Sequence, residues 1–223
     1  MASFYVVLGC IALGLAGFLL IAGVLWRLPC RRRHLPCPTW LAWLVELENP
    51  LSRTVRASVI VRYLELQPGM KVADVGCGPG RLTVPLAKQV GERGSVIAVD
   101  IQPSMLDRVH EKANRYGLRN IRLLCAGADR QELGANTFDR AVMVSVLGEV
   151  PDPQAALKQV FNAVRPGGLL LVGESLFDPH YLPRRTVLCL AHKAGWRDKA
   201  YHASCLDYAL VFEKPTIERH LDS

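Results

Sequence analysis

The sequence predicts an α/β protein with a Rossmann-like, mostly parallel sheet and helices on both of its faces. From Lys71 onward, short apolar runs alternate with segments of helical periodicity, which is typical of parallel strands joined by helices. The first apolar run, residues 72–75, stops at a loop that contains Gly76, Gly78 and Gly80. Glycine lets the backbone turn tightly and approach a ligand closely, so this loop is the first candidate binding element.

Each predicted element follows from the local pattern. Short apolar runs bounded by glycine, proline or acidic residues indicate strands, and apolar residues at every third or fourth position indicate helices. The expected strands are residues 72–75, 96–99, 121–125, 141–144 and 169–173. The expected helices are residues 51–64, 81–90, 104–116, 153–164 and 186–194. Residues 197–203 and 208–213 are expected to pair as an antiparallel hairpin at one edge of the sheet.

Composition and charge restrict the class of function. The chain has 223 residues and a formal net charge of +7. Residues 1–36 contain four arginines and no acid, so the remainder carries 23 basic against 20 acidic residues. A nearly neutral main domain argues against a broad nucleic-acid footprint. The seven cysteines show neither a paired spacing nor a zinc pattern, so we expect free thiols and no metal site.

The N-terminal segment predicts a membrane anchor. Residues 4–26 carry no charge and are long enough to cross a hydrocarbon layer of about 30 Å as a helix. The arginines at positions 31–33 follow this segment, which predicts an N-terminus outside and a cytoplasmic main domain. We therefore expect a single-pass membrane protein with its anchor and basic flank in residues 1–33.

Residues 34–67 are expected to form two helices between the anchor and the main domain. Trp40, Trp43, Leu44 and Leu47 fall on one face of the first helix. This face suits an interfacial helix in the lipid headgroup layer, and it equally suits packing against the domain. The main domain is then expected at residues 68–215, with a tail at 216–223.

The glycine loop and three later signatures carry a resemblance to a known family. A dinucleotide fingerprint would place a third glycine where this chain has Arg81, and an acid, Asp74, precedes Gly76 by two residues. The later signatures are Asp100 after the second strand, Gly127-Ala128-Asp129 after the third, and Phe138-Asp139 with Arg165-Pro166-Gly167-Gly168 around the fourth and fifth. The chain resembles the class I S-adenosylmethionine-dependent methyltransferases, and is similar to the ubiquinone and menaquinone biosynthesis C-methyltransferases.

The resemblance implies S-adenosyl-L-methionine as the cofactor. Asp100 would accept hydrogen bonds from both ribose hydroxyls, although it can also serve as a solvated acid before the next helix. Asp129 resembles the acid that receives the adenine amine, and Asp74 would lie beneath the methionine amino group. The expected cofactor-binding residues are Asp74, Gly76, Cys77, Gly78, Gly80, Asp100, Ile101, Ala128, Asp129 and Ser145.

Three residues beyond the fourth and fifth strands are catalytic candidates. The cofactor's sulfonium already activates its methyl group, so the protein mainly aligns the acceptor and excludes water. An acceptor that arrives protonated also needs a base. Glu149, Glu174 and His180 lie where that base is expected, and each can equally be a structural polar group. No cluster matches the metal-dependent catechol-type enzymes, and the Asn/Asp-Pro-Pro-Tyr/Phe signature of base methylation is absent.

These features predict a membrane-anchored methyltransferase for a lipophilic acceptor such as a quinone, an isoprenoid or a phospholipid. Membrane lipids are the expected surroundings, and nucleic acid is not expected as a partner. Three alternatives stay open: a scaffold or regulator with the same fold, a methyltransferase for a soluble or protein acceptor, and a nucleotide-binding oxidoreductase. The missing third glycine counts against the last of these.

Overall fold

The computed structural model describes residues 52–130 and 133–216, together with the single residues Tyr5, Gly14 and Glu46. Within this described part, no helix is long and apolar enough to cross a membrane. Apart from the three single residues, the expected membrane span at residues 4–26 and the expected interfacial helix lie outside the described residues.

A seven-stranded sheet forms the centre of the described part, with the strand order β3-β2-β1-β4-β5-β7-β6. The strands are β1 (Lys71–Val75), β2 (Ser95–Asp100), β3 (Ile121–Cys125), β4 (Phe138–Val144), β5 (Val164–Ser175), β6 (Arg197–Ala203) and β7 (Asp207–Glu213). Strands β1 to β5 are parallel, whereas β7 runs antiparallel to both β5 and β6. The expected mostly parallel sheet with an antiparallel edge hairpin is therefore confirmed.

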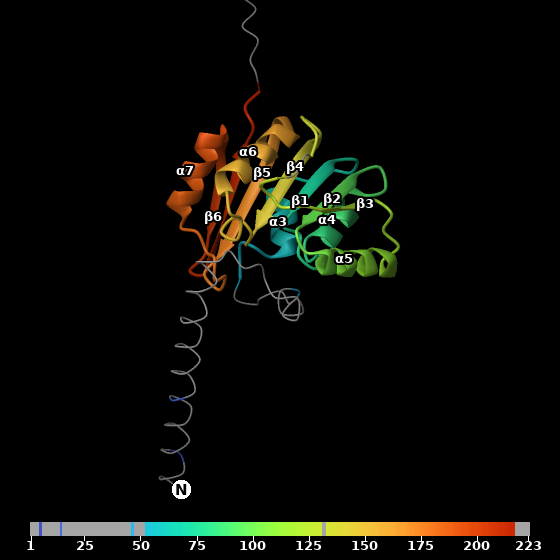
Figure 1. Cartoon of the computed structure of the whole chain (residues 1–223), viewed down its shortest axis with the longest axis horizontal. Coiled ribbons are helices and arrows are strands. Elements are labelled where there is room, and N and C mark those ends of the chain that lie inside the picture. The colour runs from blue at the N-terminus through green and yellow to red at the C-terminus, as the bar shows by residue number, and fades with distance from the viewer. Residues whose placement is uncertain (1–4, 6–13, 15–45, 47–51, 131–132, 217–223) are drawn as a thin grey trace, which may run out of the picture.

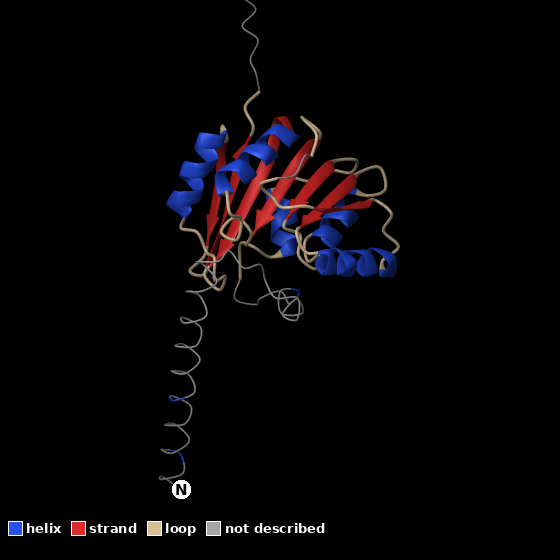
Figure 2. Ribbon diagram, in the orientation of Figure 1, coloured by secondary structure: helices blue, strands red, loops and turns tan. Residues whose placement is uncertain are grey.

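Helices cover both faces of this sheet. The helices are α3 (Ala57–Tyr63), α4 (Thr83–Val90), α5 (Pro103–Arg115), α6 (Pro153–Ala163) and α7 (Arg184–Ala194). Helices α3, α4 and α5 lie on one face, and α6 and α7 lie on the other (Figure 1). Figure 2 shows the two helical layers on either side of the sheet. The connecting helices change from one face to the other because the chain adds strands outward from β1 to β3 and then, from β4, toward the opposite edge of the sheet.

Both faces of the central strands are buried. Val72 and Val142 pack in the cluster beneath α3 and α4, while Ala73 and Met143 pack beneath α6 and α7. Successive residues of a strand point to opposite faces, so a strand covered on both sides is mostly apolar along its length, with Asp74 in β1 and Asp139 and Arg140 in β4 as buried exceptions. This explains why the central strands read as continuous apolar runs rather than as alternating ones.

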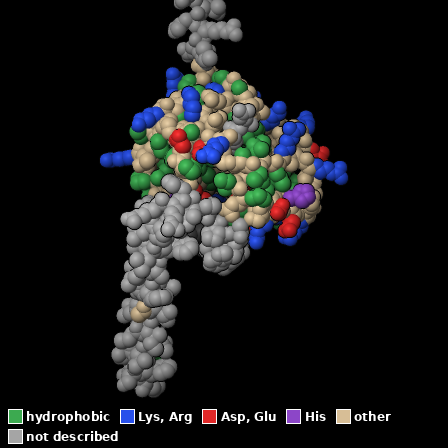
Figure 3. All heavy atoms as spheres, in the orientation of Figure 1, with side chains coloured by type: hydrophobic (Ala, Val, Ile, Leu, Met, Phe, Trp, Pro, Cys, Tyr) green, Lys and Arg blue, Asp and Glu red, His purple; other side chains and the backbone are tan. Residues whose placement is uncertain are grey.

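The surface of the described part carries dispersed charge. On the face in Figure 3, Lys and Arg side chains are spread among hydrophobic and acidic side chains and do not gather in one patch. Nucleic-acid-binding proteins present a basic patch or stripe. This face of the described part has no such patch.

Several boundaries differ from the sequence prediction. Helix α4 begins at Thr83 rather than at residue 81, because the glycine loop continues as turns up to that point. Strand β5 starts at Val164, before the expected turn, and β7 lies between β5 and β6. The predicted antiparallel hairpin is confirmed, but its second strand, β7, lies inside the sheet and its first strand, β6, forms the edge.

The largest difference is the start of α3, which Asp207 on β7 determines. The amides of Arg53 and Thr54 donate to the Asp207 carboxylate at 2.9 and 3.2 Å, and the Thr54 hydroxyl donates at 2.8 Å. These bonds hold the backbone out of helical geometry, so α3 begins at Ala57 and not at residue 51. Burial alone would raise the pKa of Asp207, but hydrogen bonds from Ser204, Thr54 and neighbouring groups outweigh burial and lower it.

We predict that Asp207→Ala lowers the free energy of unfolding by about 1.5–3 kcal/mol, since buried donors lose a charged acceptor. The folded pKa lies below the unfolded value. The stabilisation is therefore complete above about pH 4 and is lost as the pH falls through the folded pKa. Urea unfolding at neutral and acidic pH measures this difference. Asp198→Ala, on the exposed edge strand, is the matched control and should change stability little. Equal losses of unfolding free energy in both variants would contradict the stabilising role assigned to Asp207.

Candidate active site

The candidate site lies at the carboxyl ends of β1, β2, β4 and β5. The strand order reverses between β1 and β4, and open α/β sheets bind ligands in the crevice outside the strand ends at such a point. The glycine loop follows β1, and residues 145–150 follow β4. The fold therefore brings the two loops with the most predicted site residues to the same place.

The glycine loop is held close to β2. The amide of Gly76 donates to the carbonyl oxygen of Val99 at 2.8 Å. Gly76 and Gly78 have φ angles of 71° and 50°, in the region that glycine adopts without steric cost. A Cβ added at Gly76 would collide with the side chain of Val146, whereas a Cβ at Gly78 would meet nothing within 4 Å. Gly76 thus serves packing between two loops, and Gly78 faces open space where a ligand can approach.

Two side chains from other elements hold the outer part of this loop. Arg81 donates through Nη1 to the carbonyl oxygen of Val55 at 2.9 Å, and Lys112 of α5 donates through Nζ to that of Pro79 at 2.7 Å. Sequence reasoning missed both contacts, because neither residue belongs to a recognisable motif. The glycine loop is therefore fixed in position by α5 and by the segment before α3.

Asp74 on β1 links the strand before the glycine loop to the helix after it. Its carboxylate accepts a hydrogen bond of 2.6 Å from the Thr83 hydroxyl at the start of α4. Burial raises the pKa of Asp74 to about 6, although the bond from Thr83 and the charge of Arg81 oppose this. The structure thus gives Asp74 a bonding role within the turn. Cys77 is also buried, and burial together with the nearby Asp74 and Asp100 raises the pKa of its thiol, which is therefore neutral.

Asp100 joins the glycine loop to the end of β2. One carboxylate oxygen accepts a bond from the Gly78 amide at 2.9 Å, and the other accepts from the Gln102 amide at 2.9 Å. Burial raises the pKa of Asp100, while these backbone bonds lower it in part. Each oxygen keeps a second lone pair for a ligand. The carboxylate predicted to bind ribose is therefore already oriented by two amides.

The remaining cofactor candidates surround this carboxylate. Ile101 is 61% exposed directly after Asp100, which leaves an apolar side chain at the rim of the crevice. Ala128 and Asp129 lie in the turn after β3, and both are half-buried. Ser145, at the end of β4, has a φ of 55°, which is uncommon for a residue other than glycine. Such conformations cluster at functional sites, but the sequence alone gives no sign of this one.

The three catalytic candidates come together with a fourth residue, Asp178. The Nδ1 atom of His180 lies 3.6 Å from Oε1 of Glu149 and 3.7 Å from Oδ1 of Asp178. Glu174 is buried at the end of β5 and accepts a bond of 3.2 Å from the Leu182 amide. The sequence suggested Glu149, Glu174 and His180 separately. It gave no reason to single out Asp178, which precedes a proline in an ordinary-looking turn.

Burial and mutual repulsion disfavour negative charge in this group. Burial raises the pKa of Glu149 to about 8, with further contributions from Asp178 and Asp100. Burial, followed by Asp178, likewise raises the pKa of Glu174 well above its ordinary value. The contribution of Asp100 to Glu149 places the catalytic candidates within electrostatic reach of the cofactor candidates. Glu149, Asp178 and His180 are thus brought together, and the cofactor candidates follow neighbouring strands of the same sheet.

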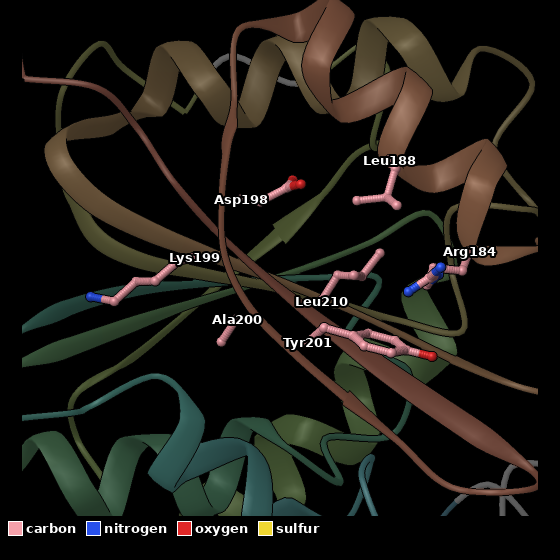
Figure 4. A pocket seen from close by; sticks show the side chains of 7 residues that line it. All are labelled: Arg184, Leu188, Asp198, Lys199, Ala200, Tyr201 and Leu210. Carbon is pink, nitrogen blue, oxygen red and sulfur yellow. The ribbon is translucent and has the colours of Figure 1, made fainter.

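A separate pocket lies between α7 and the strands β6 and β7, away from the glycine loop. Its volume is about 240 Å³, and it is lined by Arg184, Leu188, Asp198, Lys199, Ala200, Tyr201 and Leu210. Figure 4 shows Arg184 and Tyr201 side by side at one end of it, where the guanidinium lies 4.6 Å from the ring centroid. None of the predicted site residues lines this pocket. It is smaller than the range of about 300–1,000 Å³ usual for ligand sites.

Comparison with known proteins agrees with the fold. Residues 72–168 match the protein family described as "Methyltransferase domain". A demethylmenaquinone methyltransferase of Bacillus cereus is 34% identical over 115 residues, which are 52% of this chain and 48% of that protein. The chain thus spans about half the length of the curated relatives it matches.

Solved structures share the fold at lower identity. A SAM-dependent methyltransferase from Aquifex aeolicus aligns with a TM-score of 0.72 at 23% identity, over 80% of this chain and 100% of that one. The [4+2]-cyclase SpnF aligns with a TM-score of 0.66 at 15% identity, over 72% of this chain and 80% of that one. Residues 72–168 thus match a methyltransferase domain in sequence, the chain shares the fold of methyltransferases, and these matches imply S-adenosyl-L-methionine as the cofactor.

Proposed function

We propose that this protein transfers a methyl group from S-adenosyl-L-methionine to a small lipophilic acceptor at a membrane surface. The observation that carries the proposal is the Asp100 carboxylate, which the Gly78 amide holds beside an open stretch of the glycine loop. A buried carboxylate oriented in this way is suited to bind a pair of neighbouring hydroxyls, as a ribose presents.

The surrounding residues suit the rest of the cofactor. The exposed side chain of Ile101 would pack on the adenine ring, and Asp129 would accept a bond from the adenine amine. The open space at Gly78 would admit the methionine part of the cofactor toward Asp74. Ser145 directly follows β4 and would offer its carbonyl oxygen. In this arrangement, the sulfonium faces the loops after β4 and β5.

The acceptor would meet the methyl group at the group formed by Glu149, Glu174 and His180. Methyl transfer needs the nucleophile in line with the methyl carbon and sulfur, with water excluded. An acceptor that arrives with a hydroxyl proton must also lose it. The side chain of Glu149 is 24% exposed and that of His180 only 4%, so Glu149 is the member of this group that an acceptor reaches first.

Three features support a lipophilic acceptor. Leu176 and Phe177, in the loop after β5, expose 40% and 51% of their surface beside the catalytic candidates. The main domain is nearly neutral, which suits an uncharged or amphiphilic molecule. The Bacillus cereus relative is named a demethylmenaquinone methyltransferase, and a quinone is a membrane-dissolved molecule. A quinone-type acceptor is therefore our first choice.

Membrane anchoring through residues 4–26 completes the proposal, with the N-terminus outside and the main domain in the cytoplasm. Position 26 and Glu46 are twenty positions apart in the chain. Glu46 forms an ion pair of 3.2 Å with Lys112, the residue that also bonds to Pro79 of the glycine loop. Twenty residues span at most about 70 Å, so the anchor would hold the active site within reach of a substrate dissolved in the bilayer.

We predict that Asp100→Ala weakens S-adenosyl-L-methionine binding by about tenfold to hundredfold, because charge-assisted bonds worth about 1.5–3 kcal/mol are lost. Isothermal titration calorimetry on the folded variant measures this loss. Asp107→Ala, which removes an exposed carboxylate from the following helix, is the control. Unchanged affinity in the Asp100 variant would refute the cofactor site, and tighter binding of a nicotinamide cofactor would favour an oxidoreductase.

Substitutions at the two loop glycines should have different effects, one on stability and the other on cofactor binding. Gly76→Ala should destabilise the fold, because its Cβ collides with Val146, and Val146→Ala in the same chain should restore part of the loss. Gly78→Val should leave packing largely intact apart from about 1–2 kcal/mol of backbone strain, yet abolish cofactor binding. Thermal unfolding and calorimetry separate the two effects. If both single variants lost stability and cofactor affinity to the same extent, the two glycines would not have separate roles in packing and binding.

The membrane part of the proposal has its own test. Removal of residues 1–33 should greatly reduce methyl transfer to a hydroquinone, the reduced form of a quinone, embedded in liposomes, while the affinity for S-adenosyl-L-methionine stays unchanged. The full-length protein should sediment with membranes and resist high salt and carbonate, which release surface-bound basic segments. A truncated protein that is fully active on water-soluble acceptors and inactive on lipid extracts would favour a soluble acceptor. Cofactor binding without any turnover would favour a scaffold or regulator.

A further inference from the structure

We propose that Glu149, Asp178 and His180 form a binding site for a divalent first-row metal ion, with Zn²⁺ preferred, next to the site of methyl transfer. We call these three residues the carboxylate–histidine cluster. The binding site itself is independent of the proposed function, and only its role in activating an acceptor rests on that function.

The distances within the cluster favour a shared cation over direct hydrogen bonds. One ligand atom from each residue lies within 4.8 Å of the other two. The distances of 3.6 and 3.7 Å from His180 Nδ1 to the two carboxylates exceed the range of about 2.7–3.2 Å for hydrogen bonds from nitrogen to oxygen. Two ligand atoms that each lie about 2.1 Å from one tetrahedral ion are about 3.4 Å apart. The two distances from His180 therefore need to shorten by only a few tenths of an ångström, and the two carboxylate oxygens, which lie within 4.8 Å of each other, would move closer together.

The backbone around the cluster is already fixed. A Cβ at Gly148 would collide with the carbonyl oxygen of His180, so the loops after β4 and β5 touch backbone to backbone. The carboxylate of Asp178 accepts a bond of 2.7 Å from the His180 amide, and the Asp178 amide donates to Ser175 at 2.9 Å. Outer bonds of this kind orient metal ligands. Residues from two separate loops are thus held with their ligand atoms facing one point.

A further buried carboxyl group lies beside the cluster. Glu174 lies next to the cluster, and its Oε1 atom is buried with no hydrogen-bond partner in the described part of the chain. A divalent ion favours the ionised form of the carboxylates that bind it.

The donor set indicates the class of ion. One imidazole nitrogen and two carboxylate oxygens suit Zn²⁺ and other first-row ions, whereas Mg²⁺ and Ca²⁺ prefer oxygen ligands alone. Three protein ligands leave a coordination position open, as in catalytic zinc sites. An acceptor hydroxyl that entered this position would lose its proton more readily, because the ion lowers the pKa of a bound oxygen. This would restrict the acceptor to molecules with a hydroxyl near the methylated atom.

Titration calorimetry on the metal-free, untagged, full-length protein tests the site, with Zn²⁺, Mn²⁺ and Mg²⁺ as probes. We expect one Zn²⁺ site per chain, weaker binding of Mn²⁺ and no measurable binding of Mg²⁺. Asp178→Asn and Glu149→Gln should each weaken Zn²⁺ binding by at least about tenfold to hundredfold, the effect known for loss of even an outer partner of a ligand. Glu149 is partly exposed, so its variant should fold even if a buried variant does not.

His192→Gln is the matched control. His192 lies 2.7 Å from Asp198, which makes an exposed histidine–carboxylate pair without a third ligand, so its loss should leave Zn²⁺ binding unchanged. Absence of saturable Zn²⁺ binding, or equal affinity in the wild type and in folded Asp178→Asn, would overturn the proposal. Binding is measured without cofactor and acceptor. A protein that binds Zn²⁺ but methylates nothing would therefore support the metal site while contradicting the proposed function.

Discussion

The bond from the Gly78 amide to the Asp100 carboxylate is the constraint on which the candidate site depends. It ties the loop after β1 to the end of β2, and the Gly76 amide reinforces it through Val99. Without these contacts, a loop rich in glycine would sample many conformations. With them, an acidic side chain and an open stretch of backbone are presented together before any ligand arrives, which lowers the cost of ordering them on binding.

Features that depend on neighbouring residues in the chain could be predicted from the sequence. The central strands are buried on both faces and therefore read as apolar runs, and Asp100 could be identified because it ends such a run. The hairpin could be recognised, but not the insertion of β7 beside β5, because that choice depends on which strand edges meet. The start of α3 was wrong for the same reason, since Asp207 lies more than 150 residues away from Thr54.

The carboxylate–histidine cluster shows what sequence reasoning misses. Glu149 and His180 were found as separate polar residues after two strands, and neither Asp178 nor the convergence of all three was foreseen. Their distances follow from the contact between Gly148 and the His180 backbone, which brings two loops together. A sequence motif describes residues at fixed separations along the chain. These three residues come from two loops that meet only in the folded sheet. The prediction of no metal site rested on the cysteine spacings and on the lack of a cluster like that of the metal-dependent catechol-type enzymes, and neither criterion considers residues that meet only in the folded chain.

The contact at Gly148 has a consequence for how proteins of this kind diverge. Any side chain at position 148 would push the loop after β5 away, so this position cannot vary unless both loops are rebuilt together. The exposed side chains of Leu176 and Phe177 carry no such restriction. The tip of the loop can therefore change its exposed side chains by single substitutions, while the backbone that holds Glu149 and His180 stays the same.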